Sequence, residues 1–249
     1  PNRLLRDVPM GRLSWTITAP GSFETDLVHH CGPVAAGTYV HTLQLVDVAT
    51  GWSERVAVLG RSQEQMVEGF RRVQVRLPYA ITHLHPDNGS EFFNDHLIRY
   101  FGEEVTGLTL SRSRPYQKND NRFVEQKNAT LVRAYVGYAR LDTASQCAAL
   151  NALYDQLWVY NNLFQPVLHQ VSKVVMDGKL RRRWDRAQTP YQRVLASGIL
   201  SEEQETRLAQ LYAATNPRQL HQDIYRAIEQ LWQHTDQRKE AAVSGNISK

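Results

Sequence analysis

The sequence has few cysteines and no long apolar run, and these two absences narrow the class of protein. Cys31 and Cys147 are the only cysteines among 249 residues, and they form no Cys-x-x-Cys pair. Neither a disulfide framework nor a cysteine zinc site is therefore predicted, and we expect both thiols to be reduced and partly buried. No stretch is long and apolar enough to cross a bilayer, and the first residues do not resemble a secretory signal. We therefore expect a cytoplasmic protein without a membrane partner.

The composition, by contrast, is that of an ordinary globular protein. With 42% hydrophobic and 22% charged residues, the chain has room for one substantial core and a smaller appendage. The formal net charge is only +4, but seven basic residues lie between Ser111 and Arg140, against two acidic ones, and a second basic block runs from Lys179 to Arg193. Such blocks favour a polyanionic partner, although solvated helix faces give the same pattern.

The stretch from His85 to Phe92, His-Pro-Asp-Asn-Gly-Ser-Glu-Phe, places Asp87 at the end of a short apolar run. Residues Ile81 to Leu84 predict a buried strand, and the Pro, Asn and Gly that follow predict a turn that ends it. A carboxylate at a strand end is well placed for chemistry. A turn-forming role alone would also explain this residue.

Two further carboxylates lie on predicted elements far away in the sequence. Residues Phe23 to Val28 alternate between apolar and polar, which predicts a strand that carries Asp26. Residues Asp120 to Arg140 show a near-helical recurrence of apolar side chains, with Glu125 in the first or second turn. Clustered carboxylates are the hard oxygen ligands that Mg²⁺ prefers, and two such ions can clamp the attacking and leaving oxygens of a phosphoryl displacement.

The other predicted elements complete a mixed α/β domain with a helical region after it. Strands are predicted at 38–48, 52–59 and 108–110, and helices at 61–77, with Ser62 as N-cap, and at 94–101 and 143–164. Beyond them we predict an extended segment at 171–177, a basic arm at 178–186, an N-cap at Thr189, helices at 201–214 and 217–232, and a polar tail after Thr235. We divide the chain into a lead-in (1–20), a catalytic core (21–170) and a basic arm with a helical C-terminal region (171–249).

Three stretches together resemble the motifs of a known catalytic region. They are Phe23–His30 (FETDLVHH), His85–Phe92 (HPDNGSEF) and Ser113–Asn128 (SRPYQKNDNRFVEQKN). The order and approximate spacing of their Asp, Asp and Glu are similar to the DDE pattern of the retroviral-integrase-type catalytic region of bacterial insertion-sequence transposases, across about residues 21–166. The resemblance implies a ribonuclease H-like mixed five-stranded sheet flanked by helices. It also implies two Mg²⁺ or Mn²⁺ ions, with Asp26, Asp87 and Glu125 as the catalytic metal ligands.

The same resemblance implies DNA as the partner, both mobile-element ends and target, and more than one protomer to hold two ends. We predict DNA contacts from the loop before the Glu125 helix, from that helix and from the basic arm: Arg112, Arg114, Tyr116, Lys118, Asn119, Asn121, Arg122, Lys127, Arg181, Arg182 and Arg183. The interval from Asp87 to Glu125 is a little longer than the usual one in this family. The sequence does not begin with Met, so it leaves open whether a DNA-reading domain precedes it.

Three functions therefore stay open at this point. The first is a DNA transposase or integrase that cleaves and joins strands in the bacterial cytoplasm. The second is a ribonuclease H-like nuclease that cleaves without joining, and the third is a catalytically silent DNA-binding or assembly module. The intact set of three acids favours an active enzyme. The histidines at 29, 30, 83 and 85 and Cys31 lie near the predicted site, but their spacing fits no closed tetrahedral zinc arrangement.

Overall fold

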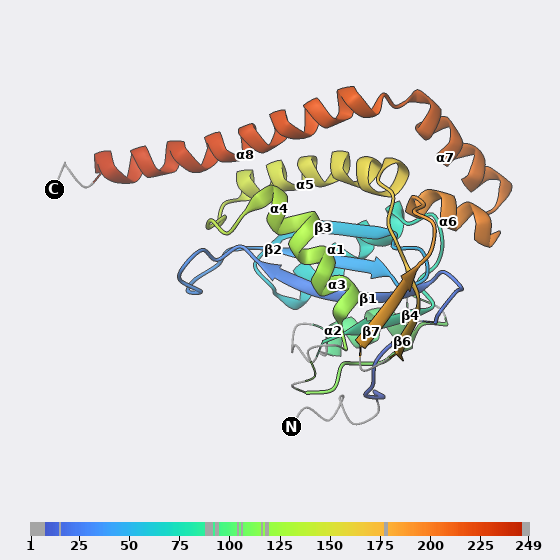
Figure 1. Cartoon of the computed structure of the whole chain (residues 1–249). Coiled ribbons are helices and arrows are strands. Elements are labelled where there is room, and N and C mark those ends of the chain that lie inside the picture. The colour runs from blue at the N-terminus through green and yellow to red at the C-terminus, as the bar shows by residue number, and fades with distance from the viewer. Residues whose placement is uncertain are drawn as a thin grey trace.

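The computed structural model describes residues 8–14, 16–87, 92, 95–103, 105, 107–115, 117, 120–176 and 179–245, and within them one mixed sheet forms the centre of the molecule (Figure 1). Its strands are β1 (Ser22–His29), β2 (Val40–Asp47), β3 (Ser53–Leu59), β4 (His83–Pro86) and β5 (Thr109–Leu110). Their spatial order is β3-β2-β1-β4-β5, so β1 is the central strand. The prediction of a five-stranded sheet is confirmed.

The directions of the strands define the fold class. β1, β2 and β3 form an antiparallel meander, as their short connections predicted, and β4 and β5 run parallel to β1. Because the chain leaves β3 through a helix, it returns to the opposite edge of the meander, beside β1. This mixed sheet with helices on both faces is a ribonuclease H-like fold, as the sequence motifs implied.

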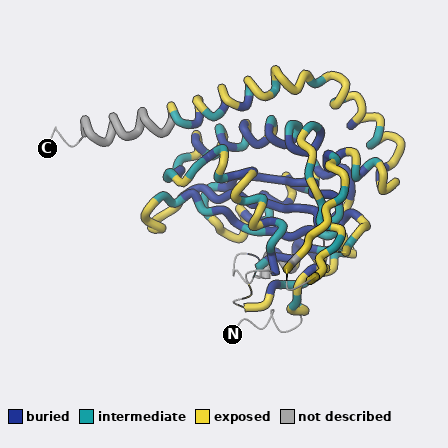
Figure 2. Tube along the Cα trace, viewed as in Figure 1, coloured by how far each residue is buried: buried dark blue, intermediate teal, exposed yellow. Residues whose placement is uncertain are grey.

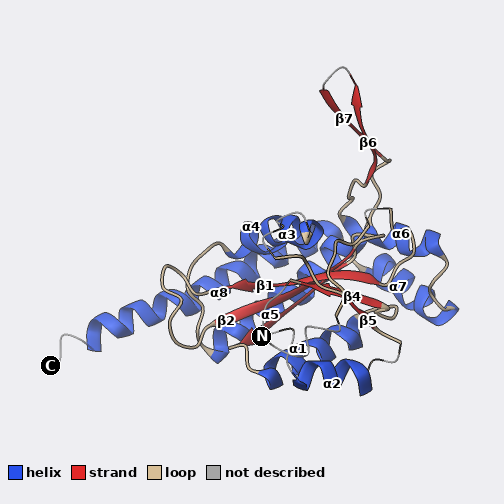
Figure 3. Cartoon of the chain, turned by 90° about the horizontal axis from the view of Figure 1, so that it is seen from below, coloured by secondary structure: helices blue, strands red, loops and turns tan. Residues whose placement is uncertain are grey.

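Helices cover both faces of the sheet, and Figure 3 shows the sheet edge-on between them. One face carries α1 (Gln63–Arg76) and α2 (Asp95–Glu103); the other carries α3 (Arg122–Lys127), α4 (Ala134–Val136) and α5 (Ala144–Val159). In α1, Met66 and Phe70 are fully buried against the sheet, and in α5, Leu153 and Tyr154 are fully buried on its other side. The strands are correspondingly buried along most of their length (Figure 2).

The predicted helix at 120–140 is interrupted by a wider turn. A π-helical segment, η2 (Asn128–Arg133), connects α3 to α4, and a second one, η3 (Tyr160–Phe164), follows α5. The helix ends before Gly137, whose φ of +65° suits glycine. The predicted N-caps are confirmed, because the hydroxyl groups of Ser62 and Thr189 accept hydrogen bonds from backbone N–H groups in the first turns of their helices.

The C-terminal part differs from the prediction in two places. The basic arm is one strand of a hairpin, because β6 (Gln170–Met176) and β7 (Lys179–Trp184) pair antiparallel and stand away from the body (Figure 3). After α6 (Pro190–Ser197) and α7 (Glu202–Ala214), α8 (Pro217–Gly245) runs back along α5 (Figure 1). The prediction of a polar tail after Thr235 was wrong, because no Gly or Pro interrupts this helix before Gly245.

Neither cysteine is in a disulfide, and both are partly buried, as predicted. In the described part of the chain, every helix is too short or too polar to cross a membrane.

Candidate active site

Two of the predicted metal ligands lie side by side on neighbouring parallel strands. The register of β1 with β4 ends with Thr25 opposite Pro86; Asp26 is the next residue of β1, and Asp87 directly follows the end of β4. Burial, the charge of Asp87 and, more weakly, the charge of Glu125 raise the pKa of Asp26 from 3.8 to about 7. Hydrogen bonds from the Leu27 N–H and from a helix side chain offset part of this shift. The fold therefore brings two repelling carboxylates together.

The start of the Glu125 helix is fastened to β1 by a buried acid. The Oε2 atom of Glu24 accepts hydrogen bonds from the N–H groups of Phe123 (2.6 Å) and Val124 (3.0 Å). These donors are among the free N–H groups of a helix start, where a negative charge is favourable. Burial nevertheless raises the pKa of Glu24 to about 7, although these two hydrogen bonds and the charge of Arg122 lower it. Glu24 thus acts as a cap supplied by another element.

Two asparagines attach the same helix to the next two residues of β1. Asn121, which is 5% exposed, donates through Nδ2 to the carbonyl of Thr25 (3.1 Å). Asn128 donates through Nδ2 to Oδ2 of Asp26 (2.6 Å). Three consecutive strand residues therefore hold the helix, and one of them is itself a predicted metal ligand.

Glu125 lies one helical turn before Asn128 and is exposed at the surface of α3. Its charge raises the pKa of both Glu24 and Asp26, so it lies within electrostatic range of the pair on the strands. Nevertheless, across the part of the chain that the structure describes, no three His, Cys, Asp or Glu side chains come close enough together to form a ready-made metal site. The fold thus brings Asp26 and Asp87 together, and Glu125 lies within electrostatic range of Asp26 without completing a three-residue cluster.

The histidines near this site are used as hydrogen-bond partners. His83 and His85 each bond through a ring nitrogen to the hydroxyl of Ser111 at 2.6 Å, and His30 bonds to the hydroxyl of Thr42 at 2.7 Å. Burial lowers the pKa of His30 to about 3 and that of His85 to about 4, so both are neutral at physiological pH. These contacts account for the histidines without a zinc ion.

Some of the residues predicted to contact DNA make contacts within the protein, some lie outside the described residues, and the rest are on α3 or the hairpin. Arg114 is bound to Asp120 by a bidentate ion pair (2.8 and 2.9 Å), and the backbone of Arg112 pairs with residues 9–11. Asn121 is used inside the protein, as described above, while Tyr116, Lys118 and Asn119 lie outside the described residues. The others are on α3 or the hairpin: Arg122, Lys127, Arg181, Arg182 and Arg183.

Two residues that shape this site, Glu24 and Asn128, were not among the predicted site residues. Glu24 lies two residues before Asp26 on a strand, and Asn128 lies three residues after Glu125 on a helix. Both spacings place the side chain on the same face as the predicted ligand. That periodicity was a usable signal, since both residues are part of the motifs that carry the resemblance.

Comparisons with known proteins give one sequence relative and a structural likeness. No protein-family model matches the chain. The "Uncharacterized protein y4rM" of Sinorhizobium fredii (strain NBRC 101917 / NGR234) is 37% identical over 180 residues, which are 72% of this chain, and the chain spans about half (51%) of that protein. Among solved structures, the catalytic core domain of BIV integrase is 18% identical, with a TM-score of 0.46, over 72% of this chain and 95% of that domain.

Proposed function

We propose that this chain is the catalytic region of a DNA transposase or integrase, a polynucleotidyl transferase that cleaves and joins strands at the ends of a mobile element. The observation that carries the proposal is the placement of Asp26 and Asp87 at adjacent positions of paired strands, with the Glu125 helix bound to the same strand. Like charges this close destabilise the fold unless a cation relieves them. Two neighbouring carboxylates that repel each other are better explained by metal binding than by a role in packing.

The chemistry of these donors fits Mg²⁺ or Mn²⁺, because carboxylate oxygens are hard ligands. Asp26, Asp87 and Glu125 would hold two ions, which supply activation of the attacking oxygen and stabilisation of the leaving oxygen. Asn128 fixes the rotamer of Asp26 through Oδ2, and the Leu27 N–H fixes Oδ1. Each oxygen keeps a further lone pair for a cation. Glu24 is not a ligand in this proposal, because its Oε2 is bound to the helix start.

Exposed basic side chains favour DNA as the substrate. Arg181, Arg182 and Arg183 are all exposed on β7, with Lys173 and Lys179 on the same hairpin. Such cations bind phosphates with little sequence preference and release counterions from DNA. Joining two element ends to a target requires at least two protomers, so we propose that the active form is a multimer.

The proposed function is tested with DNA that carries the element's own terminal repeats. The wild type is expected to cleave and join such DNA only with Mg²⁺ or Mn²⁺, and Asp87→Asn is expected to reduce both reactions by at least about a thousandfold, to background. Asp155→Asn, an isosteric change at an exposed acid on α5, is the control and is expected to keep full activity. Joining that survives in Asp87→Asn would remove this carboxylate from the mechanism. Hydrolysis without joining would favour the nuclease, and DNA binding without either reaction would favour the silent module.

A second substitution tests the role of Asn128. Asn128→Ala removes the hydrogen bond to Asp26 Oδ2, so we expect cleavage to fall about tenfold to a hundredfold, as for other groups that orient metal ligands. The loss is expected to appear as a higher Mg²⁺ requirement, which is measured by titrating the metal in the cleavage assay. Gln219→Ala removes an exposed amide on α8 and serves as the control. An unchanged metal requirement in Asn128→Ala would contradict the positioning role.

A further inference from the structure

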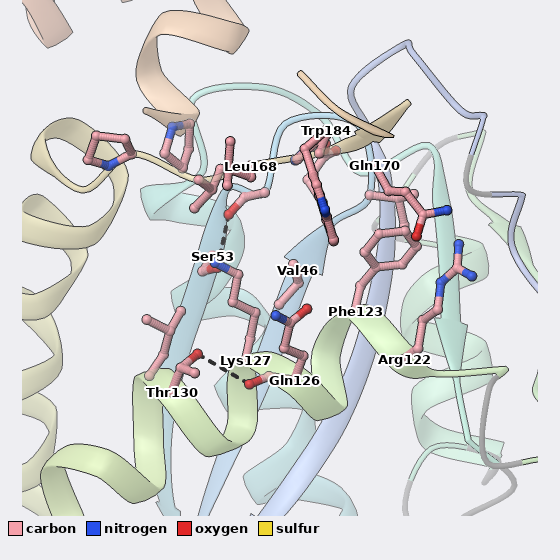
Figure 4. Close-up of a pocket in the computed structure, with 18 of the residues that line it drawn as sticks. Val46, Ser53, Arg122, Phe123, Gln126, Lys127, Thr130, Leu168, Gln170 and Trp184 are labelled. Carbon is pink, nitrogen blue, oxygen red and sulfur yellow. Dashed lines mark hydrogen bonds between the residues drawn. The ribbon is translucent and has the colours of Figure 1, made fainter. Parts of the chain in front are cut away.

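A cavity of about 810 Å³ lies beside the helix α3 (Figure 4). Phe123, Gln126, Lys127 and Thr130 line it, and their spacing of three, four and seven residues defines one helix face. Glu125 and Asn128 lie on the other face, where Asn128 bonds to Asp26 of β1. The remaining walls are the turn between β2 and β3, residues 165–170 and the β6–β7 hairpin. The proposed metal site and the cavity therefore share one helix as their common wall.

The lining of the cavity combines cations with aromatic rings. Arg12, Arg122 and Lys127 come from the body, and Lys173 and Arg182, which are cross-strand partners, come from the hairpin. Figure 4 shows Trp184 reaching in from the hairpin and Phe123 and Lys127 from α3. The one carboxylate among the lining residues, Asp47, already accepts hydrogen bonds from the N–H groups of Gly21 and Thr50. The cavity thus favours an anionic ligand with a flat apolar part.

A buried amide in the wall also points to a ligand. Asn161 is 4% exposed and lines the cavity, yet neither its Oδ1 nor its Nδ2 has a hydrogen-bond partner among the described residues. An unpaired buried polar group costs about 1–3 kcal/mol, and an amide can pair with both a donor and an acceptor on the edge of a nucleobase. A ligand that supplies such an edge removes this cost.

We propose that this cavity binds an unpaired nucleotide of the DNA strand, with the base stacked on Trp184 and the phosphate among the cations. The proposal rests on the proposed function, because the nucleotide is taken to belong to the DNA substrate. In that function the same DNA is cleaved at Asp26 and Asp87, on the other side of α3. Aromatic rings and cations together are the features that bind single-stranded nucleic acid. The volume lies within the range of ligand sites, roughly 300–1,000 Å³.

The surroundings of the cavity favour a strand over a free nucleotide. Arg122 lies at the edge of the cavity where α3 begins, close to the helix start that Glu24 caps, and its charge acts on Glu24. At the other side, Lys173 and Arg182 pair across the hairpin on the face that lines the cavity. The base of the hairpin is fixed, because Asp185 accepts hydrogen bonds from the His169 N–H and from Arg193. Cations therefore lie at two sides of the cavity, Arg122 at the helix start and Lys173 with Arg182 on the hairpin, where a phosphate backbone that enters and leaves the cavity can contact them.

The test compares two duplexes of equal paired length, one blunt and one with a short unpaired overhang that carries 2-aminopurine. The full-length wild-type chain is expected to bind the overhang duplex more tightly and to quench the 2-aminopurine by stacking. Trp184→Ala is expected to reduce the affinity for the overhang about tenfold and leave the blunt duplex within about twofold. Trp184→Phe is expected to restore most of the preference. Tyr225→Ala, which removes an exposed aromatic ring from α8, is the control.

Two outcomes would overturn the cavity proposal. An equal loss of affinity for both duplexes in Trp184→Ala would make Trp184 part of a general DNA surface. Deoxyadenosine monophosphate that binds as tightly as the overhang, and depends on Trp184 in the same way, would assign the site to a free nucleotide. The proposed function can fail independently of the cavity proposal. A chain that prefers the overhang duplex but never cleaves DNA would keep the cavity as a nucleotide site and would contradict the proposed strand cleavage.

Discussion

Replacing Asp26 with asparagine is expected to abolish metal-dependent strand cleavage and, at the same time, to make the folded chain more stable. Asparagine removes one of the two neighbouring carboxylates and the charge that a metal ion needs, so activity is lost. Its Oδ1 can accept the hydrogen bond from the Leu27 N–H, and its Nδ2 can donate to Oδ1 of Asn128 once that amide is turned over. The substitution therefore removes a buried charge and its repulsion from Asp87 without opening a cavity. Loss of function and gain of stability are expected from one cause.

The pH dependence of this gain follows from the direction of the pKa shift. The pKa of Asp26 is raised from 3.8 to about 7 in the folded state. Ionisation of this carboxyl group therefore does not change the free energy of unfolding below about pH 4, and it lowers this free energy by its full amount above about pH 7. The wild type is thus expected to lose stability as the pH rises from about 4 to about 7, and Asp26→Asn to lose less. We expect the variant to gain roughly 1–3 kcal/mol near pH 8.

The measurement is thermal or urea unfolding across this pH range, with a chelator present so that bound metal does not offset the repulsion. Asp155→Asn is the matched control, because Asp155 is 71% exposed and an exposed ion pair contributes at most about 1 kcal/mol. An Asp26→Asn variant that is equally stabilised at pH 4 and at pH 8 would show that the gain does not come from the carboxylate charge.

Replacing Glu24 with alanine is expected to destabilise the fold by about 3–4 kcal/mol. The change leaves the buried N–H groups of Phe123 and Val124 without an acceptor and opens a cavity between β1 and α3. Glu24→Gln keeps an acceptor oxygen in the same place. Because burial already raises the pKa of Glu24 to about 7, the site tolerates a neutral side chain, and we expect glutamine to cost about 1 kcal/mol or less.

Unfolding in urea measures these costs, and hydrogen exchange at the two amides tests their cause. Exchange is expected to accelerate at Phe123 and Val124 in Glu24→Ala and to stay slow in Glu24→Gln. Glu203→Ala is the matched control, because Glu203 is an exposed acid in the first turn of α7, where it contributes through the helix dipole only about 0.3–1 kcal/mol. Equal destabilisation by the alanine variants of Glu24 and Glu203 would rule out the proposed capping role.

The sheet and most helices could be predicted from the sequence because their signals are local. Alternation identified β1, and the apolar run followed by Pro and Gly placed Asp87 at a strand end. The hairpin was missed because four of the six residues of β7 are basic and show no apolar alternation, and its partner strand is defined only by pairing. Single-sequence patterns also give no strand order, so the adjacency of Asp26 and Asp87 became visible only with the parallel register of β1 and β4.

The hydrogen-bond partners that hold the Glu125 helix on β1 could not be predicted from the sequence either, because they lie far apart in the chain. The Glu24 cap joins residues 99 and 100 positions apart, and the bond from Asn128 to Asp26 spans 102 positions. Asn121 is a residue type that often caps a helix, yet its side chain makes no cap hydrogen bond and donates to the Thr25 carbonyl of β1 instead. Periodicity places a residue on a face, but only the tertiary fold decides which surface that face meets.

These long sequence separations have a consequence for when the site appears during folding. Loops of about a hundred residues close late, since the entropy of closure must be offset by contacts formed afterwards. Asp26 and Asp87 come together with the sheet, whereas the helix with Glu125 docks only after residues 120–128 have been synthesised and the sheet surface exists. A nascent or partly folded chain therefore holds an incomplete acid set. If the proposed function holds, we expect strand cleavage only from chains whose core has finished folding.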